Sequence, residues 1–203
     1  GGGGRPRRRR LLVGGAILLA VAAAMVAALL VLLGGGGGSE QADTTAGLRL
    51  TTEEIAVART LGDETSKLAE SVEDGTPSSQ LAGDLESTAG RAGVLARKAT
   101  GELGSGGPAA AAIRGAARDL RQAAAVEAEV AAAPTAPGAA GRARESKRSM
   151  EAALAGIEAA LGAMRIGFIA EGNTGVAETV EKSEAQLRGV GLTGPFDALI
   201  TAL

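Results

Sequence analysis

The residue types that usually carry chemistry are largely missing from this chain. Its 203 residues include no Cys, His, Trp or Tyr. Their absence excludes disulfides, thiol and imidazole catalysis, and the usual zinc, haem and iron–sulfur sites. Without histidine, a serine or threonine nucleophile would need lysine as its base. The nearest such spacing is Thr179-Val180-Glu181-Lys182, which on a helix is typical of a solvated face. We therefore predict no catalytic residue and no enzymatic activity.

Carboxylates offer the metal chemistry that remains, an all-oxygen site for Ca²⁺ or Mg²⁺. Five of them lie close together in the sequence: Asp63, Glu64, Glu70, Glu73 and Asp74. Their spacing is not that of an EF-hand loop, and on a helix they indicate a solvated acidic surface. We therefore predict no metal site and no cofactor.

Arginine is the residue type whose spacing predicts a binding surface. Arg114, Arg118 and Arg121 recur at intervals that place them on one face of a helix. Such a stripe could bind an anionic ligand, a lipid headgroup or an acidic wall polymer. The alternative, which we favour at this point, is ion pairing with acidic helices expected around residues 51–75 and 174–189. The 16 basic and 23 acidic residues after position 33 argue against nucleic acid as a partner.

The apolar run at 11–33 indicates where in the cell the protein is located. It contains 23 residues without a charge and would span about 35 Å as a helix, enough to cross a bilayer. Five arginines precede this run in the sequence: Arg5, Arg7, Arg8, Arg9 and Arg10. The positive-inside rule then puts residues 1–10 in the cytoplasm and the rest of the chain outside the cell membrane. We predict a single-pass signal anchor.

A cleaved signal peptide is the alternative for this segment. Signal peptides have an apolar stretch of about 7–15 residues followed by a small-x-small cleavage site. The run at 11–33 is longer, and only Gly34-Gly35-Gly36 offers a site after it. If cleavage occurs, the mature protein is a secreted helical protein.

The remaining residues have a helical pattern. Residues 34–49 are predicted to be a flexible Gly-rich tether, and residues 50–203 a helical bundle. The first helix is expected to start at a capping box made by Thr51 and Glu54 and to stop at Gly75. Later helices are expected from Thr76-Pro77 to about 101, from Pro108 to about 133, at about 143–170 and 174–189, and from Pro195 onward.

These elements predict an all-α fold: an N-terminal transmembrane helix followed by an Ala/Gly-rich antiparallel bundle of four long helices and one or two short ones. We see no alternating β-branched and aromatic pattern that would indicate a strand. Large apolar residues are few, and glycines recur inside the expected helices, as at Gly62, Gly93 and Gly156. Each such glycine costs up to about 1 kcal/mol of helix propensity. We therefore expect closely packed helices and modest stability.

The function predicted from these features is that of a non-enzymatic, membrane-anchored extracytoplasmic module in protein interaction or envelope structure. Its partners would be the lipid bilayer and either another envelope protein or a second copy of the chain. The alternative is a ligand-sensing domain, because the segment order resembles the extracytoplasmic bundles of bacterial chemoreceptors and histidine kinases. The absence of a second span and a signalling region in this sequence favours the interaction module. No small-molecule ligand can be named.

Overall fold

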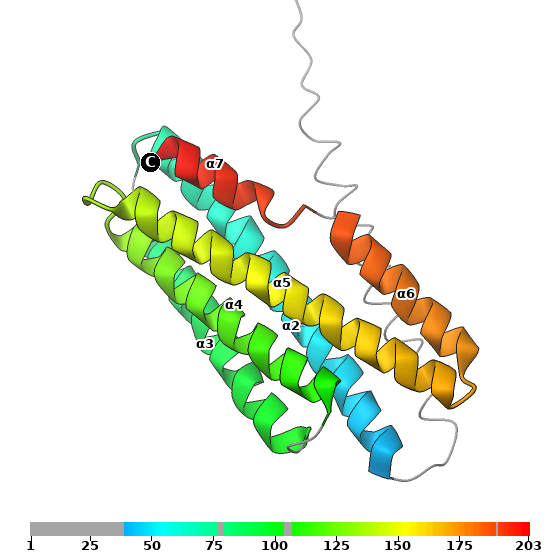
Figure 1. The fold of residues 1–203 in the computed structure, drawn as a ribbon. Helices are drawn as coiled ribbons and strands as arrows, with labels where there is room; N and C mark the ends of the chain where they lie inside the picture. The colour runs from blue at the N-terminus through cyan, green and yellow to red at the C-terminus, as the bar shows by residue number, and fades with distance from the viewer. Residues whose placement is uncertain (1–38, 77–78, 104–106, 190) are drawn as a thin grey trace, which may run out of the picture.

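A computed structural model describes residues 39–76, 79–103, 107–189 and 191–203. This part of the chain is helical, with no strand. Its helices are α2 (Ser39–Glu73), α3 (Ser79–Glu102), α4 (Pro108–Ala132), α5 (Ala139–Ala170), α6 (Thr174–Gly189) and α7 (Gly194–Ala202) (Figure 1). The predicted bundle of four long and two short helices is therefore confirmed. The predicted basic segment with its five arginines, the membrane span at 11–33 and residues 34–38 of the tether lie outside the described residues.

The four long helices run alternately up and down the bundle (Figure 1). Helix α4 packs against both α3 and α5, and α2 contacts α3, α4 and α5. The two short helices then run back along the outside: α6 lies against α5, and α7 lies against α2 and α5. In Figure 1, α6 and α7 follow one another as a fifth helix broken in the middle. Phe196 and Leu199 of α7 are fully buried, so the apolar C-terminal segment packs on the bundle.

The core combines large apolar side chains with many buried alanines. Alanines such as Ala116, Ala117 and Ala153 are completely buried where α4 meets α5. At Gly156 of α5, an added Cβ would lie 3.1 Å from the Ala116 Cβ and 3.3 Å from the Ala112 carbonyl oxygen. Both contacts are tighter than ordinary van der Waals distances, so α4 would have to shift to admit a side chain, and close packing through small residues is confirmed at this contact.

The start of α2 differs from the prediction. The helix begins at Ser39, so residues 39–49 of the expected tether are helical. The prediction that a capping box at Thr51 and Glu54 starts the helix is therefore wrong. The Thr51 hydroxyl is buried inside the helix, where it donates to the Gly47 carbonyl oxygen at 2.9 Å. The physical reason is that Leu48 and Leu50 are also buried, which extends the packed face of the helix upstream of Thr51.

Helix α5 is long and apolar enough to cross a membrane, as judged by length and composition alone. In the bundle it is a central helix instead. Its large apolar residues Met150, Ile157, Leu161 and Phe168 are fully buried against the other helices. The span predicted at 11–33 stays a prediction, since it lies outside the described residues.

The Gly156 contact leads to a stability prediction. Gly156→Val should lower the free energy of unfolding by about 1–3 kcal/mol, because the new side chain must push α4 and α5 apart. The measurement is urea unfolding of the full chain in detergent micelles, followed by far-UV circular dichroism.

The matched control is Gly115→Ala on α4, where an added Cβ meets nothing within 4 Å. This change should raise stability by up to about 1 kcal/mol through helix propensity. Equal effects of the two substitutions would contradict close packing at Gly156.

Candidate functional site

A groove of about 590 Å³ runs along the surface where α3 meets α4. Small residues and arginines line it. From α3 come Gly93, Ala96, Arg97, Thr100 and Gly101, and from α4 come Arg114, Arg118 and Arg121. The structure thus brings the three arginines of the predicted stripe to one site and adds a fourth, Arg97, from the neighbouring helix.

Two of these arginine side chains lie next to Gly93. A Cβ added at position 93 would lie 3.5 Å from the Cδ of Arg121 and 3.8 Å from a terminal nitrogen of Arg97. The two arginines therefore approach the same point from opposite helices. Farther along the groove, the Nε of Arg118 donates to the Arg114 carbonyl oxygen at 3.2 Å, which restrains its side chain.

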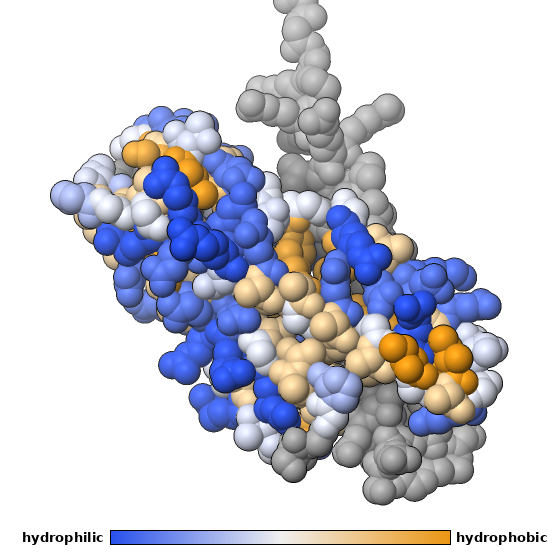
Figure 2. Space-filling model, viewed as in Figure 1, coloured by the Kyte–Doolittle hydropathy of each residue, from blue (hydrophilic) through white to orange (hydrophobic). Residues whose placement is uncertain are grey.

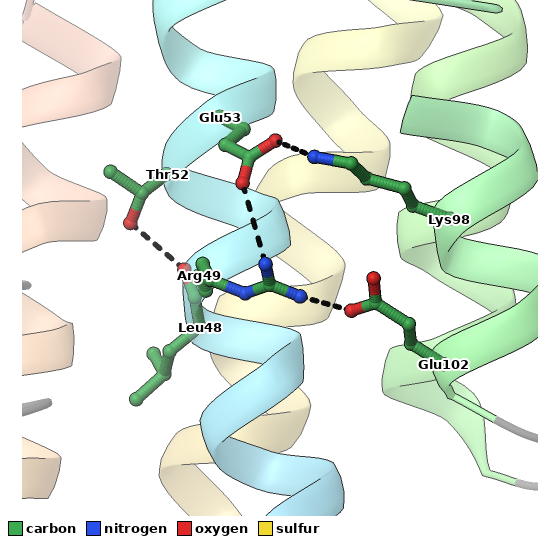
Figure 3. Close-up of polar contacts among 6 residues, drawn as sticks. All are labelled: Leu48, Arg49, Thr52, Glu53, Lys98 and Glu102. Atoms are coloured by element: carbon green, nitrogen blue, oxygen red, sulfur yellow. Dashed lines mark hydrogen bonds and ion pairs between the residues drawn. The ribbon is translucent and has the colours of Figure 1, made fainter. Parts of the chain in front are cut away.

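Several acidic residues of the bundle pair with cations outside the groove. Glu53 of α2 lies 3.1 Å from Lys98 and 3.9 Å from Arg49, and Arg49 also pairs with Glu102 (Figure 3). At the other side of the bundle, Arg165 of α5 lies 3.8 Å from Glu181 of α6. Glu53 of α2 and Glu181 of α6, from the two helices on which the pairing alternative relied, are thus paired with cations outside the groove.

Three of the four arginines of the groove are outside these ion pairs. Within the described residues, no ion pair joins Arg97, Arg118 or Arg121 to a carboxylate. The groove is therefore a concentration of positive charge on a bundle whose charge is otherwise mostly negative. Such a site attracts anions and raises their local concentration.

The chemistry available in the groove is binding. Guanidinium groups present planar forks that match carboxylate and phosphate oxygens and can bind them bidentately. Thr100 supplies the groove's hydroxyl, which already donates to the Ala96 carbonyl oxygen at 2.9 Å. The lining residues include no carboxylate that could act as a base for this hydroxyl.

Sequence reasoning missed two acids in the core. Glu54 of α2 is 1% exposed, and neither carboxyl oxygen has a hydrogen-bond partner in the described part of the chain. Burial raises its pKa to about 9. Glu127 of α4 is fully buried, and burial raises its pKa to about 8. The Thr65 hydroxyl faces Glu127 and opposes this rise, but its proton goes to the Leu61 carbonyl oxygen at 2.8 Å.

The acidic cluster expected on the surface is divided. Asp63, Glu70, Glu73 and Asp74 are exposed as predicted, whereas Glu64 is buried. Glu64 turns toward α3, where the Thr88 hydroxyl donates to it at 3.1 Å; burial raises its pKa despite this bond. The reason is that Glu64 lies on the side of α2 that packs against α3. Among the described residues, no group of three acids is placed to hold a metal ion.

Comparisons of the chain with known protein families, with curated proteins and with solved structures find no match. The groove, its charge and the elements around it are therefore the basis for a functional proposal.

The buried acids generate a prediction about pH. The raised folded-state pKa of Glu54 means that the folded protein binds more protons than the unfolded chain between about pH 4.5 and 9. Stability should therefore fall as the pH rises through this window. Glu54→Gln removes the ionisation and should raise stability at pH 8 by about 1–3 kcal/mol, with little change at pH 5.

Urea unfolding of the full chain at the two pH values measures this difference. Glu70→Gln, at an exposed position of the same helix, is the control and should change stability little at either pH. An unchanged pH dependence in Glu54→Gln would show that the Glu54 carboxyl is solvated.

Proposed function

We propose that this chain is a non-enzymatic, membrane-anchored helical module that binds an acidic surface of another envelope protein through its α3–α4 groove. The observation that carries the proposal is the set of arginines that line this groove, three of which have no ion-pair carboxylate among the described residues. A partner that supplies carboxylates would complete the charge pairing that the bundle leaves open.

The anchored location rests on the sequence. The 23-residue apolar run at 11–33 follows five arginines, a pattern typical of a single-pass anchor with a cytoplasmic N-terminus. The bundle would then be extracytoplasmic, where it can meet other envelope components. Protease protection of a C-terminally tagged chain in spheroplasts, together with alkaline-carbonate extraction, tests this location.

A tag that is degraded by external protease, on a chain that stays in the carbonate pellet at full-length mass, is the expected result. A protected tag would place the bundle in the cytoplasm and contradict the orientation. A shortened and soluble product would mean that residues 11–33 are a cleaved signal peptide and that the mature protein is secreted.

The groove itself is tested with a charge-matched pair of variants. Poly-L-glutamate is the probe for an acidic protein surface, and its binding to the full chain in detergent micelles is measured by titration. Arg118→Gln with Arg121→Gln should weaken binding at least about tenfold, because each charge-assisted hydrogen bond contributes about 1.5–3 kcal/mol. Arg144→Gln with Arg148→Gln removes the same charge from exposed positions of α5 and should have little effect.

Equal losses in the two double variants would mean that the probe responds to net charge and not to the groove. Stronger binding of polyphosphate than of polyglutamate would point to a phosphate-bearing wall polymer as the partner. In cells, a photo-crosslinking residue at Thr100 should capture a partner in the parent chain and lose it in the groove variant.

The ligand-sensing alternative has one observation in its favour. A groove of about 590 Å³ is within the size range of small-molecule sites. A rise in melting temperature with a small dicarboxylate or inorganic phosphate, abolished by the groove variant, would support sensing over protein interaction.

A further inference from the structure

One end of the bundle gathers the start of α2, the end of α3, the start of α4 and the end of α5 (Figure 1). An apolar pocket of about 180 Å³ lies between them, and its lining includes Gly47 of α2, Leu103 after α3, Pro108 of α4 and Met164 of α5. A Cβ added at Gly47 would lie 3.2 Å from the Met164 sulfur. Residues 39–46 therefore extend beyond this level toward the same end of the bundle as the last turn of α5.

This end carries two exposed isoleucines. Ile166 is 66% exposed and Ile169 is 52% exposed, and among the described residues the one other exposed large apolar side chain is Val94 of α3. Met164 and Phe168 of the same helix point into the core, so the two isoleucines lie on the outer side of α5. Figure 2 shows strongly hydrophobic surface at this end of the helix.

The chain length brings this end close to the proposed anchor. Five residues, 34–38, separate the apolar run at 11–33 from the first residue of α2. Even a fully extended chain of this length reaches only about 20 Å. The isoleucines of α5 are therefore held near the bilayer surface. Because the tether makes their contact with the bilayer intramolecular, two apolar side chains are enough for docking.

The charge next to these isoleucines is compatible with a lipid surface. Arg165, which precedes Ile166, lies 3.8 Å from Glu181 and 3.9 Å from Glu184, both on α6. The positive charge of Arg165 is thus compensated within the bundle, and Glu171, two residues after Ile169, is exposed at the end of α5, where it can lie among lipid headgroups. The outer side of α5 continues away from this end through small side chains, including Ala155 and Ala159, which are exposed.

We propose that Ile166 and Ile169 insert into the interfacial region of the bilayer and dock this end of the bundle on the membrane. The inference rests on the proposed membrane anchor. Apolar side chains on the outer face of a helix enter the headgroup–acyl boundary in this way in interfacial helices. Docking would leave the α3–α4 groove on the side of the bundle, open to a partner.

Tryptophan reporters test the docking, because the chain has no Trp or Tyr of its own. The full chain is reconstituted in phosphatidylcholine vesicles, with and without bromine at a shallow acyl position. Ile166→Trp and Ile169→Trp should show blue-shifted emission that brominated lipid quenches. Ala152→Trp is the matched control, because position 152 is exposed on the same helix and lies about 21 Å from position 166 along the helix axis. Its emission should be the same in vesicles with and without brominated lipid.

Each other outcome overturns the proposal in a recognisable way. Absence of quenching at position 166, in a chain that resists carbonate extraction, rejects docking and leaves the anchor intact. Blue-shifted emission without bromine quenching would mean that protein covers the isoleucines, as in a second copy. If alkaline carbonate releases the chain from the membrane, the chain has no membrane anchor, and both the anchor and the docking proposals are rejected. If a tryptophan variant does not fold, a spin label on Ile166→Cys reports lipid contact by its accessibility to oxygen.

Discussion

The closeness with which α4 approaches α5 is the constraint on which the rest of the bundle depends. At Gly156 an added methyl group would lie closer than ordinary van der Waals distance to Ala116 and to the Ala112 carbonyl. Alanines bury little apolar area, so this contact must gain stability from many short distances between the helices, while large side chains such as Leu61, Leu120 and Phe168 fill other parts of the core. The helices α3 and α2, and then α6 and α7, pack around this pair. A wider spacing at Gly156 would open gaps between the alanines of the two helices.

The same core contains polar groups that such packing tolerates poorly. Glu54 and Glu127 are buried with no hydrogen bond to their carboxyl oxygens within the described chain, and burial raises both pKa values far above the ordinary range. Each must hold a proton in the folded protein at neutral pH. The Ser146 hydroxyl, by contrast, donates to the Ala123 carbonyl oxygen at 2.9 Å and links α5 to α4. The interior therefore combines polar links between helices, this one and the Thr88–Glu64 bond between α3 and α2, with two deeply buried acids that favour folding at lower pH.

The outer surface separates charge by location. Ion pairs join α2 to α3 and α5 to α6. The acidic residues in these pairs are therefore already bound to cations where the helices meet. The α3–α4 seam has arginines on both sides and a floor of small residues. The groove occupies the C-terminal half of α3 and the N-terminal half of α4, so it lies in the same half of the bundle as the exposed isoleucines of α5. If the chain is anchored as proposed, both surfaces belong to the membrane-proximal half.

Local signals in the sequence determined most of the helices, whereas the packing decided their faces and the site. Pro108 begins α4 and Thr174 begins α6 as predicted, because prolines, caps and the glycines after helices act over a few residues. The predicted start of α2 was wrong, because Leu48 and Leu50 stabilise the first turns of this helix only through contacts with helices that are distant in the sequence. Spacing alone aligned the three arginines of α4, because helical periodicity is local. Which helix lies opposite them, the contribution of Arg97 and the burial of Glu54 were decided by the tertiary structure. These depend on which faces pack against each other, and a single helix cannot specify its neighbour.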